Sequence, residues 1–87
     1  MEYITAVRYL SGYTLELTFS NGVTGTVDLS DELTGRHFVP LRDVNEFRKV
    51  RVEPDLSTIV WPNGADIAPD YLYELMQAQE HAMEMSH

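Results

Sequence analysis

The chain of 87 residues contains no cysteine and only six lysines and arginines in total. Without cysteine there is no disulfide, no cysteine–zinc site and no thiol nucleophile. No apolar run approaches the ~18 residues that a membrane helix needs, and the N-terminus has neither a basic start nor a long apolar stretch. We therefore expect a soluble, untargeted, cytoplasmic protein of bacterial type.

No motif for catalysis, metal binding or phosphate binding stands out in the sequence. His37 has no cysteine or nucleophile-elbow serine that it could activate as a general base. Asp28, Asp31 and Glu32 cluster in sequence, but they lack the ligand spacing and glycine placement of a calcium loop. We therefore expect no enzymatic activity, no metal and no cofactor.

The net charge of −8 disfavours partners that are themselves anionic, such as nucleic acids and acidic membranes. The charge is unevenly distributed, because residues 36–51 hold five cations against two carboxylates, a balance of +3 that leaves −11 on the remainder. This segment is either a local basic patch or a set of cations paired with neighbouring carboxylates, the usual arrangement at a surface.

A chain of this length closes one hydrophobic core and cannot form two stable units. Hydrophobic residues make up 44% of it and charged residues 23%, close to the globular average. We expect a single domain over residues 1–78 and a frayed C-terminal tail over 79–87, where apolar anchors are few and no C-cap is present.

Alternation of apolar and polar residues predicts a three-stranded antiparallel meander in the first third of the chain. A three-residue loop with Gly22 in the left-handed conformation places Leu15 opposite Val27 and keeps one face apolar. The same rule applied at Gly12 places Val7 opposite Leu15. Both hairpins then bury the same face of the sheet.

The remaining elements are predicted from caps and short alternating runs. Ser30 is expected to cap one helical turn, and Asp43 a short helix. Residues 50–53 and 58–61 alternate as a second hairpin, and Pro69 suits the first turn of a final helix. The stripe of that helix that should cover the sheet consists of Leu72, Leu75, Met76, Gln79 and Met83. The fold class is α+β, an antiparallel meander plus a second hairpin, with short helices and a C-terminal helix packed on the sheet.

The order of these parts resembles a bacterial family of proteins of unknown function, DUF2442. The residues that support the resemblance are Val7, Leu15, Leu17, Phe19, Asn21-Gly22, Val27-Asp28-Leu29, Phe38, Leu41, Phe47, Val50, Val52 and, above all, the block from Ile59 to Tyr73. It implies a small α+β domain with no established activity. Some relatives join such a domain to a helix-turn-helix unit, and others resemble partners of a small protein encoded nearby, in the manner of a toxin–antitoxin pair. This chain ends soon after the helix, so the resemblance argues against direct DNA binding.

The block Trp61-Pro62-Asn63-Gly64 has two interpretations. The indole is a candidate anchor of an interaction surface, but proline ends a strand and Asn-Gly forms a turn, so structure alone also explains the block. Asp66 and Asp70 flank Pro69, where they either act together as a cation or acid–base site or simply favour the start of a helix. The candidate interaction surface comprises Trp61, Asn63, Asp66, Asp70, Tyr71, Arg48 and Arg51.

Two functions remain open. The first is an intracellular protein-interaction or regulatory module, antitoxin-like, that binds a small basic protein encoded nearby. The alternative is a small-molecule or phosphate-binding domain, an unrecognised enzyme, that uses residues 36–51 beside Asp66. A homodimer formed through a sheet edge or the outer face of the last helix is compatible with either function.

Overall fold

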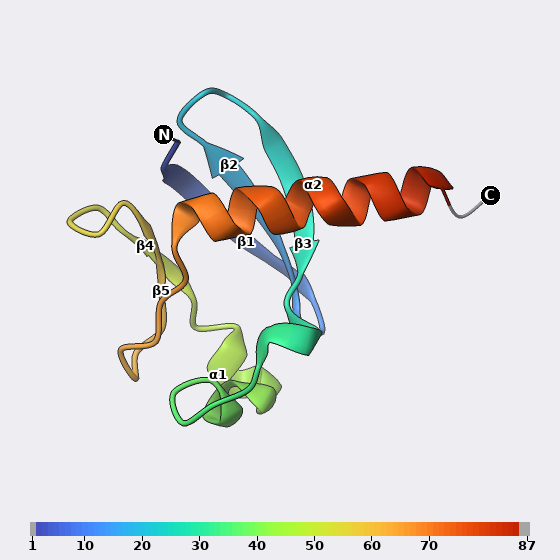
Figure 1. The fold of residues 1–87 in the computed structure, drawn as a ribbon. Helices are drawn as coiled ribbons and strands as arrows, with labels where there is room; N and C mark the ends of the chain where they lie inside the picture. Colours follow the sequence, from blue (N-terminus) through green and yellow to red (C-terminus); the bar gives the residue numbers. More distant parts are fainter. Residues whose placement is uncertain (1, 86–87) are drawn as a thin grey trace.

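The computed structural model of the protein describes residues 2–85 and contains two antiparallel sheets, several short helical turns and one long helix (Figure 1). In chain order the elements are β1 (Ile4–Ser11), β2 (Thr14–Phe19), β3 (Thr24–Asp28), the 3-10 turns η1 (Ser30–Glu32) and η2 (Val39–Arg42), α1 (Val44–Phe47), β4 (Arg51–Glu53), β5 (Thr58–Val60) and α2 (Pro69–Met85). The α+β class predicted from the sequence is confirmed.

The three-stranded sheet has the order β1-β2-β3, a simple meander. Its second hairpin has the predicted register, with Leu15 opposite Val27. The loop closes through a hydrogen bond from the Phe19 amide to the Val23 carbonyl, 2.8 Å, and Gly22 has a φ of +86°. This left-handed conformation strongly favours glycine, so Gly22 sets the register of the hairpin.

The predicted register of the first hairpin was wrong by two residues, because Val7 lies opposite Leu17 and not Leu15. A two-residue loop, residues 12–13, joins β1 to β2 in place of the predicted three-residue loop. Gly12, the first residue of this loop, has a φ of +52°, as expected for a type II′ turn. The pairing shifts around Leu10, the extra residue of β1, and this shift keeps Val7 on the buried face.

The middle of the chain forms short elements around the second hairpin. Asp43 caps α1 as predicted, since its carboxylate accepts the amide of Asn45 at 2.9 Å. The prediction for Ser30 was wrong: it is the first residue of η1, and the Asp28 carboxylate accepts its amide instead. The turn η2 was not predicted. The β4–β5 hairpin was predicted, and in it Val52 lies opposite Ile59.

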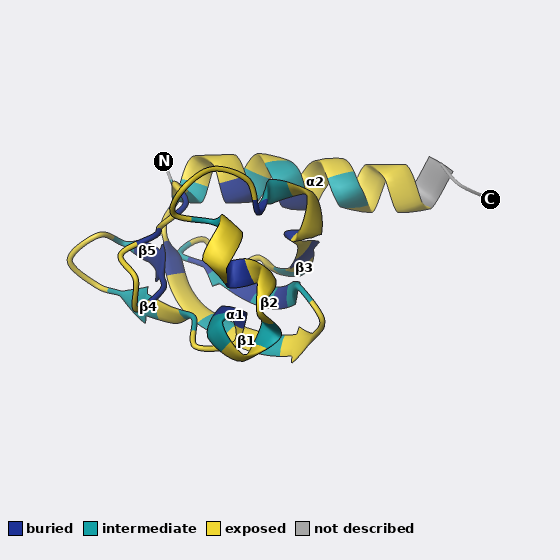
Figure 2. Ribbon diagram, turned by 90° about the horizontal axis from the view of Figure 1, so that it is seen from below, coloured by how far each residue is buried: buried dark blue, intermediate teal, exposed yellow. Residues whose placement is uncertain are grey.

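Helix α2 crosses one face of the meander, and the core lies between them (Figures 1 and 2). Leu72 and Met76 are buried against the sheet. At the crossing, β3 has Gly25, where an added Cβ would lie 2.5 Å from the Met76 sulfur. The absence of a side chain at Gly25 therefore allows the helix to approach the strand closely.

One turn further along α2, a side-chain amide joins the helix to β3. The Gln79 carbonyl oxygen accepts the backbone amide of Asp28, and the Gln79 amide donates to the backbone carbonyl of Asp28, both at 2.8 Å. Gln79 therefore lies on the sheet side of α2 as predicted. Met83 does not cover the sheet as expected, because it is 71% exposed. The C-terminal half of α2 projects past the sheet (Figure 1).

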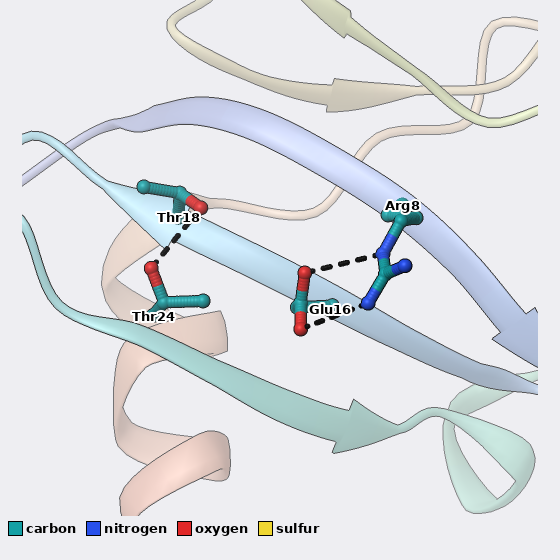
Figure 3. Close-up of polar contacts among 4 residues, drawn as sticks. All are labelled: Arg8, Glu16, Thr18 and Thr24. Atoms are coloured by element: carbon teal, nitrogen blue, oxygen red, sulfur yellow. Dashed lines mark hydrogen bonds and ion pairs between the residues drawn. The ribbon is translucent and has the colours of Figure 1, made fainter.

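The opposite face of the meander is polar, and no helix or strand of the described chain packs on it. Arg8 on β1 pairs with Glu16 on β2 through two contacts of 3.3 Å, and Thr18 lies beside Thr24 of β3 at 3.2 Å (Figure 3). Such cross-strand pairs stabilise a sheet modestly.

The predicted boundary between a domain of residues 1–78 and a frayed tail of 79–87 stays a prediction. Helix α2 continues to Met85, and residues 86–87 lie outside the described part of the chain. Within residues 2–85, no helix combines the length and the apolar character required to cross a bilayer.

Gly25→Ala is expected to destabilise the protein by about 1–3 kcal/mol, because the added methyl group overpacks the buried Met76. A methyl group added without this clash would slightly stabilise the fold. A loss of stability therefore indicates the contact with Met76. Chemical denaturation measures it. In a Met76→Ala background the same change should have little effect, and an equal loss in both backgrounds would show that the clash is not the cause.

Candidate functional site

Trp61 is a core residue, because its side chain is 1% exposed. Its indole N–H donates to the backbone carbonyl of Phe47 at 2.8 Å, and its ring packs against those of Phe47 and Phe38 with centroids 5.7 and 6.3 Å away. Both the apolar ring and the polar N–H are therefore satisfied inside the protein. The interpretation of the block as a structural element accounts for this residue.

The turn after Trp61 brings the next candidates into place. The Trp61 carbonyl accepts the amide of Gly64 and the Trp61 amide donates to Ala65, both at 2.9 Å. Asn63 holds this turn to the preceding loop, because its side-chain amide donates to the His37 carbonyl at 2.8 Å. As a result the backbone of Asp66 returns beside β5 and forms an isolated bridge with Val60.

A hollow of about 350 Å³ opens where this turn meets the start of α2. We call it the acidic hollow, and its lining residues are Glu32, Phe38, Asp66, Ile67, Ala68 and Tyr71. It combines two carboxylates with an aromatic and aliphatic floor, and no lysine, arginine or histidine of residues 2–85 lines it. This chemistry suits a cationic side chain with an apolar stem better than it suits a phosphate.

Tyr71 and Glu32 connect the two walls of the acidic hollow. The Tyr71 hydroxyl donates a hydrogen bond to the Glu32 carboxylate, which joins α2 to η1 across 39 residues of sequence. This hydrogen bond raises the pKa of Tyr71 above its ordinary value of 10.0, and burial and the charge of Glu32 act in the same direction. Tyr71 is nevertheless 45% exposed, so its ring remains accessible to a partner.

A second hollow, of about 340 Å³, lies further along the same helix. It is lined by Asp28, Ser30, Asp31, Gln79, Ala82 and Met83. Both hollows therefore lie between α2 and the segment around η1, and carboxylates of that segment line both. The side of α2 that faces η1 is an acid-walled surface interrupted by apolar residues.

The structure does not bring all seven candidates together. Asp66 and Tyr71 share the acidic hollow, whereas Asp70 lines a separate one with Glu2, Tyr73, Glu74 and Gln77. Arg48 lies 5.5 Å above the ring of Tyr9, a cation–π contact.

The remaining candidate, Arg51, forms a 3.0 Å ion pair with Glu53. The hydrogen bond from Arg51, followed by one from the Asp55 amide, lowers the pKa of the Glu53 carboxyl. Of the cations in residues 36–51, Lys49 and Arg51 have a carboxylate partner within 4 Å, while Arg36, Arg42 and Arg48 have none among the described residues. Simple pairing therefore accounts for only part of the basic segment.

Two residues of the acidic hollow, Glu32 and Phe38, were not singled out from the sequence as interaction residues. Glu32 was noted only in a local cluster of carboxylates, and Phe38 only as part of the family resemblance. Neither lies near the block at Trp61 in sequence, so only the fold brings them beside Asp66. Among residues 2–85 no group of three or more histidines and carboxylates is arranged to hold a metal ion.

Glu32→Ala is expected to lower the pKa of Tyr71 toward 10.0, because both the hydrogen bond and the negative charge are removed. An NMR titration of ¹³C-labelled tyrosine at alkaline pH measures this. A raised pKa in the folded state stabilises the fold below the pKa of the unfolded chain, and the gain is lost as pH rises through the folded-state value. The difference in the free energy of unfolding between the wild-type protein and Glu32→Ala should therefore become smaller at alkaline pH. Asp31→Ala is the control, and an equal shift in it would rule out the specific contact.

Among solved structures, the chain is similar to the "Putative DNA Binding Protein NE0471" from Nitrosomonas europaea. The two are 26% identical with a TM-score of 0.82, and the likeness covers 93% of this chain. This chain corresponds to about half of that protein, 52% of its length. No curated protein matches the chain significantly.

The description of NE0471 contradicts our prediction that direct DNA binding is disfavoured. That prediction was wrong because it relied on net charge and on the short segment after the helix. Net charge describes the whole surface, whereas contact with phosphates needs only a local group of cations. Arg36, Arg42 and Arg48 have no ion-pair partner among the described residues, although the net charge of the chain is −8.

The model of one family, described as a protein of unknown function, matches residues 4–78, which include both sheets and the docked part of α2. The resemblance that we noted on the block from Ile59 to Tyr73 is thereby confirmed. The chain belongs to the DUF2442 family.

Proposed function

We propose that this protein is a non-enzymatic interaction module that binds a basic segment of another protein on the side of α2 that faces η1. The acidic hollow is the observation on which the proposal depends. Its two carboxylates, Glu32 and Asp66, flank an apolar floor, so a lysine or arginine can place its stem on Phe38 and Ile67 and its charge at the rim.

The charge distribution around the hollow supports the same proposal. Residues 52–87 contain seven aspartates and glutamates and no lysine or arginine. The field over α2 is therefore negative along its whole length, and it would attract and orient a basic partner before contact. A regulatory, antitoxin-like role for a small basic protein partner fits this surface, and the cytoplasmic location inferred from the sequence belongs to the same proposal.

Direct contact with DNA is a second candidate function, favoured by the description of NE0471. The residues that would contact phosphates are Arg36, Arg42 and Arg48, which lack an ion-pair partner in the described part of the chain. The phosphate-binding alternative that paired residues 36–51 with Asp66 has less support, because Asp66 lies in a hollow lined by carboxylates.

The decisive experiment compares two labelled probes by fluorescence anisotropy at low ionic strength. One is a lysine-rich peptide of about 20 residues and the other a DNA duplex of about 20 base pairs, and both need only charge complementarity to reveal a binding face. We expect the peptide to bind, with affinity that falls as salt is added.

Glu32→Gln and Asp66→Asn should each weaken peptide binding about two- to fivefold, the range for one accessible ion pair. Asp55→Asn is the matched control, because it removes the same charge from the β4–β5 turn, outside the acidic hollow. Equal losses in all three variants would overturn the assignment of the site. Binding of the duplex alone, reduced by Arg48→Gln, would replace the proposal with the DNA function.

A further inference from the structure

The side of α2 that faces η1 also bears an apolar stripe next to the acidic hollow. Tyr71, Leu75, Ala78 and Ala82 follow one another at spacings of four, three and four residues, so they lie on one side of the helix. Tyr71 is 45% exposed and both alanines are exposed, whereas Leu75 is half-buried and packs against the core on one side, as predicted. We call these four residues the exposed seam.

The exposed seam borders the side of α2 that packs on the sheet, and Leu75 at this border also packs against the core. Leu72, Met76 and Gln79 contact the sheet, and each precedes or follows a seam residue by one position in the chain. A one-residue step turns a helix by about 100°, so the two sides face different directions. In Figure 2 the ribbon of α2 carries residues coloured as exposed along its length and lies above strands coloured as buried.

From this geometry we infer that the exposed seam docks an amphipathic helix of the partner protein, with lysines or arginines flanking its apolar side. The inference rests on the proposed function and names the form of the partner. Heptad-like spacing of apolar residues is the pattern that receives a second helix. The small side chains of Ala78 and Ala82 let the two helix axes approach closely. The seam spans about 16 Å, or three turns of a docked helix.

The negative charge on both sides of the exposed seam favours a basic helix over a second copy of this chain as the partner. The seam lies between carboxylates of α2 such as Glu74 and the η1 carboxylates Asp31 and Glu32, and no lysine or arginine occurs in residues 52–87. A second copy of α2 would bring the same negative charges against them, an unfavourable arrangement across an interface. A basic helix instead places its flanking cations beside both rows, and Tyr71 joins the seam to the acidic hollow at one end.

The test uses labelled helical peptides of about 20 residues, long enough to form a helix in water, with a leucine–alanine seam and flanking lysines. A second peptide has the same leucines and lysines in scrambled order, with two central alanines replaced by prolines. We expect the helical peptide to bind the protein more tightly, by about tenfold or more, because only it can match the seam. Equal binding of both peptides would overturn the helix inference and leave the basic-segment proposal standing. Failure of both to bind would overturn the two together.

The Ala78→Glu variant distinguishes helix docking on the exposed seam from attraction by charge alone, because the two predict opposite changes in peptide affinity. The change adds a negative charge, so an interaction driven by charge alone would tighten, whereas helix docking should weaken about tenfold because a long side chain fills the seam. Gln77→Glu is the matched control, since it adds the same charge one position away on an exposed residue outside the seam. Unchanged or tighter binding by Ala78→Glu would overturn the inference. Thermal denaturation checks that both variants fold.

Discussion

The hydrogen bond between the indole of Trp61 and the carbonyl of Phe47 holds together the part of the molecule that lies outside the three-stranded meander. It joins the end of β5 to the end of α1 inside the core, where an unpaired carbonyl would be costly. The same indole packs on Phe38, which forms part of the floor of the acidic hollow. The turn that follows Trp61 then sets the position of Asp66 and the start of α2. The shape of the candidate site therefore depends on a residue that is itself buried in the core.

Local chemistry explains which parts of the fold the sequence predicts well. Gly22 requires a particular loop, Asp43 can cap only the helix that follows it, and Pro69 suits only a first turn. The register of the first hairpin is different, because placing Val7 opposite Leu15 or Leu17 leaves it on the same face. A side-chain pattern with a period of two residues cannot detect a shift of two. The two-residue loop at Gly12 and the extra residue of β1 at Leu10 together distinguish the registers.

The candidate site was less predictable than the fold, since it depends on contacts between distant segments. Asp66 and Tyr71 were identified because they belong to one conspicuous block, whereas Glu32 reaches Tyr71 only after η1 and α2 have packed. Trp61 was predicted as a candidate anchor because it is the single tryptophan of the chain, but its side chain is buried in the folded structure. Burial depends on the fold and cannot be read from one residue. Net charge misled in a similar way, because it averages over arginines that have carboxylate partners and arginines that do not.

Gln79 has a consequence for how the protein behaves in a crowded solution. Its side-chain amide accepts from and donates to the backbone of Asp28, as a residue of a fourth strand would. Unpaired sheet edges are the usual starting points of fibrillar aggregation. The glutamine thus occupies part of the β3 edge with a single residue and, while α2 remains docked, prevents another molecule from adding a strand there. The helix on which we propose the interaction surface is in this way also the element that covers part of the β3 edge.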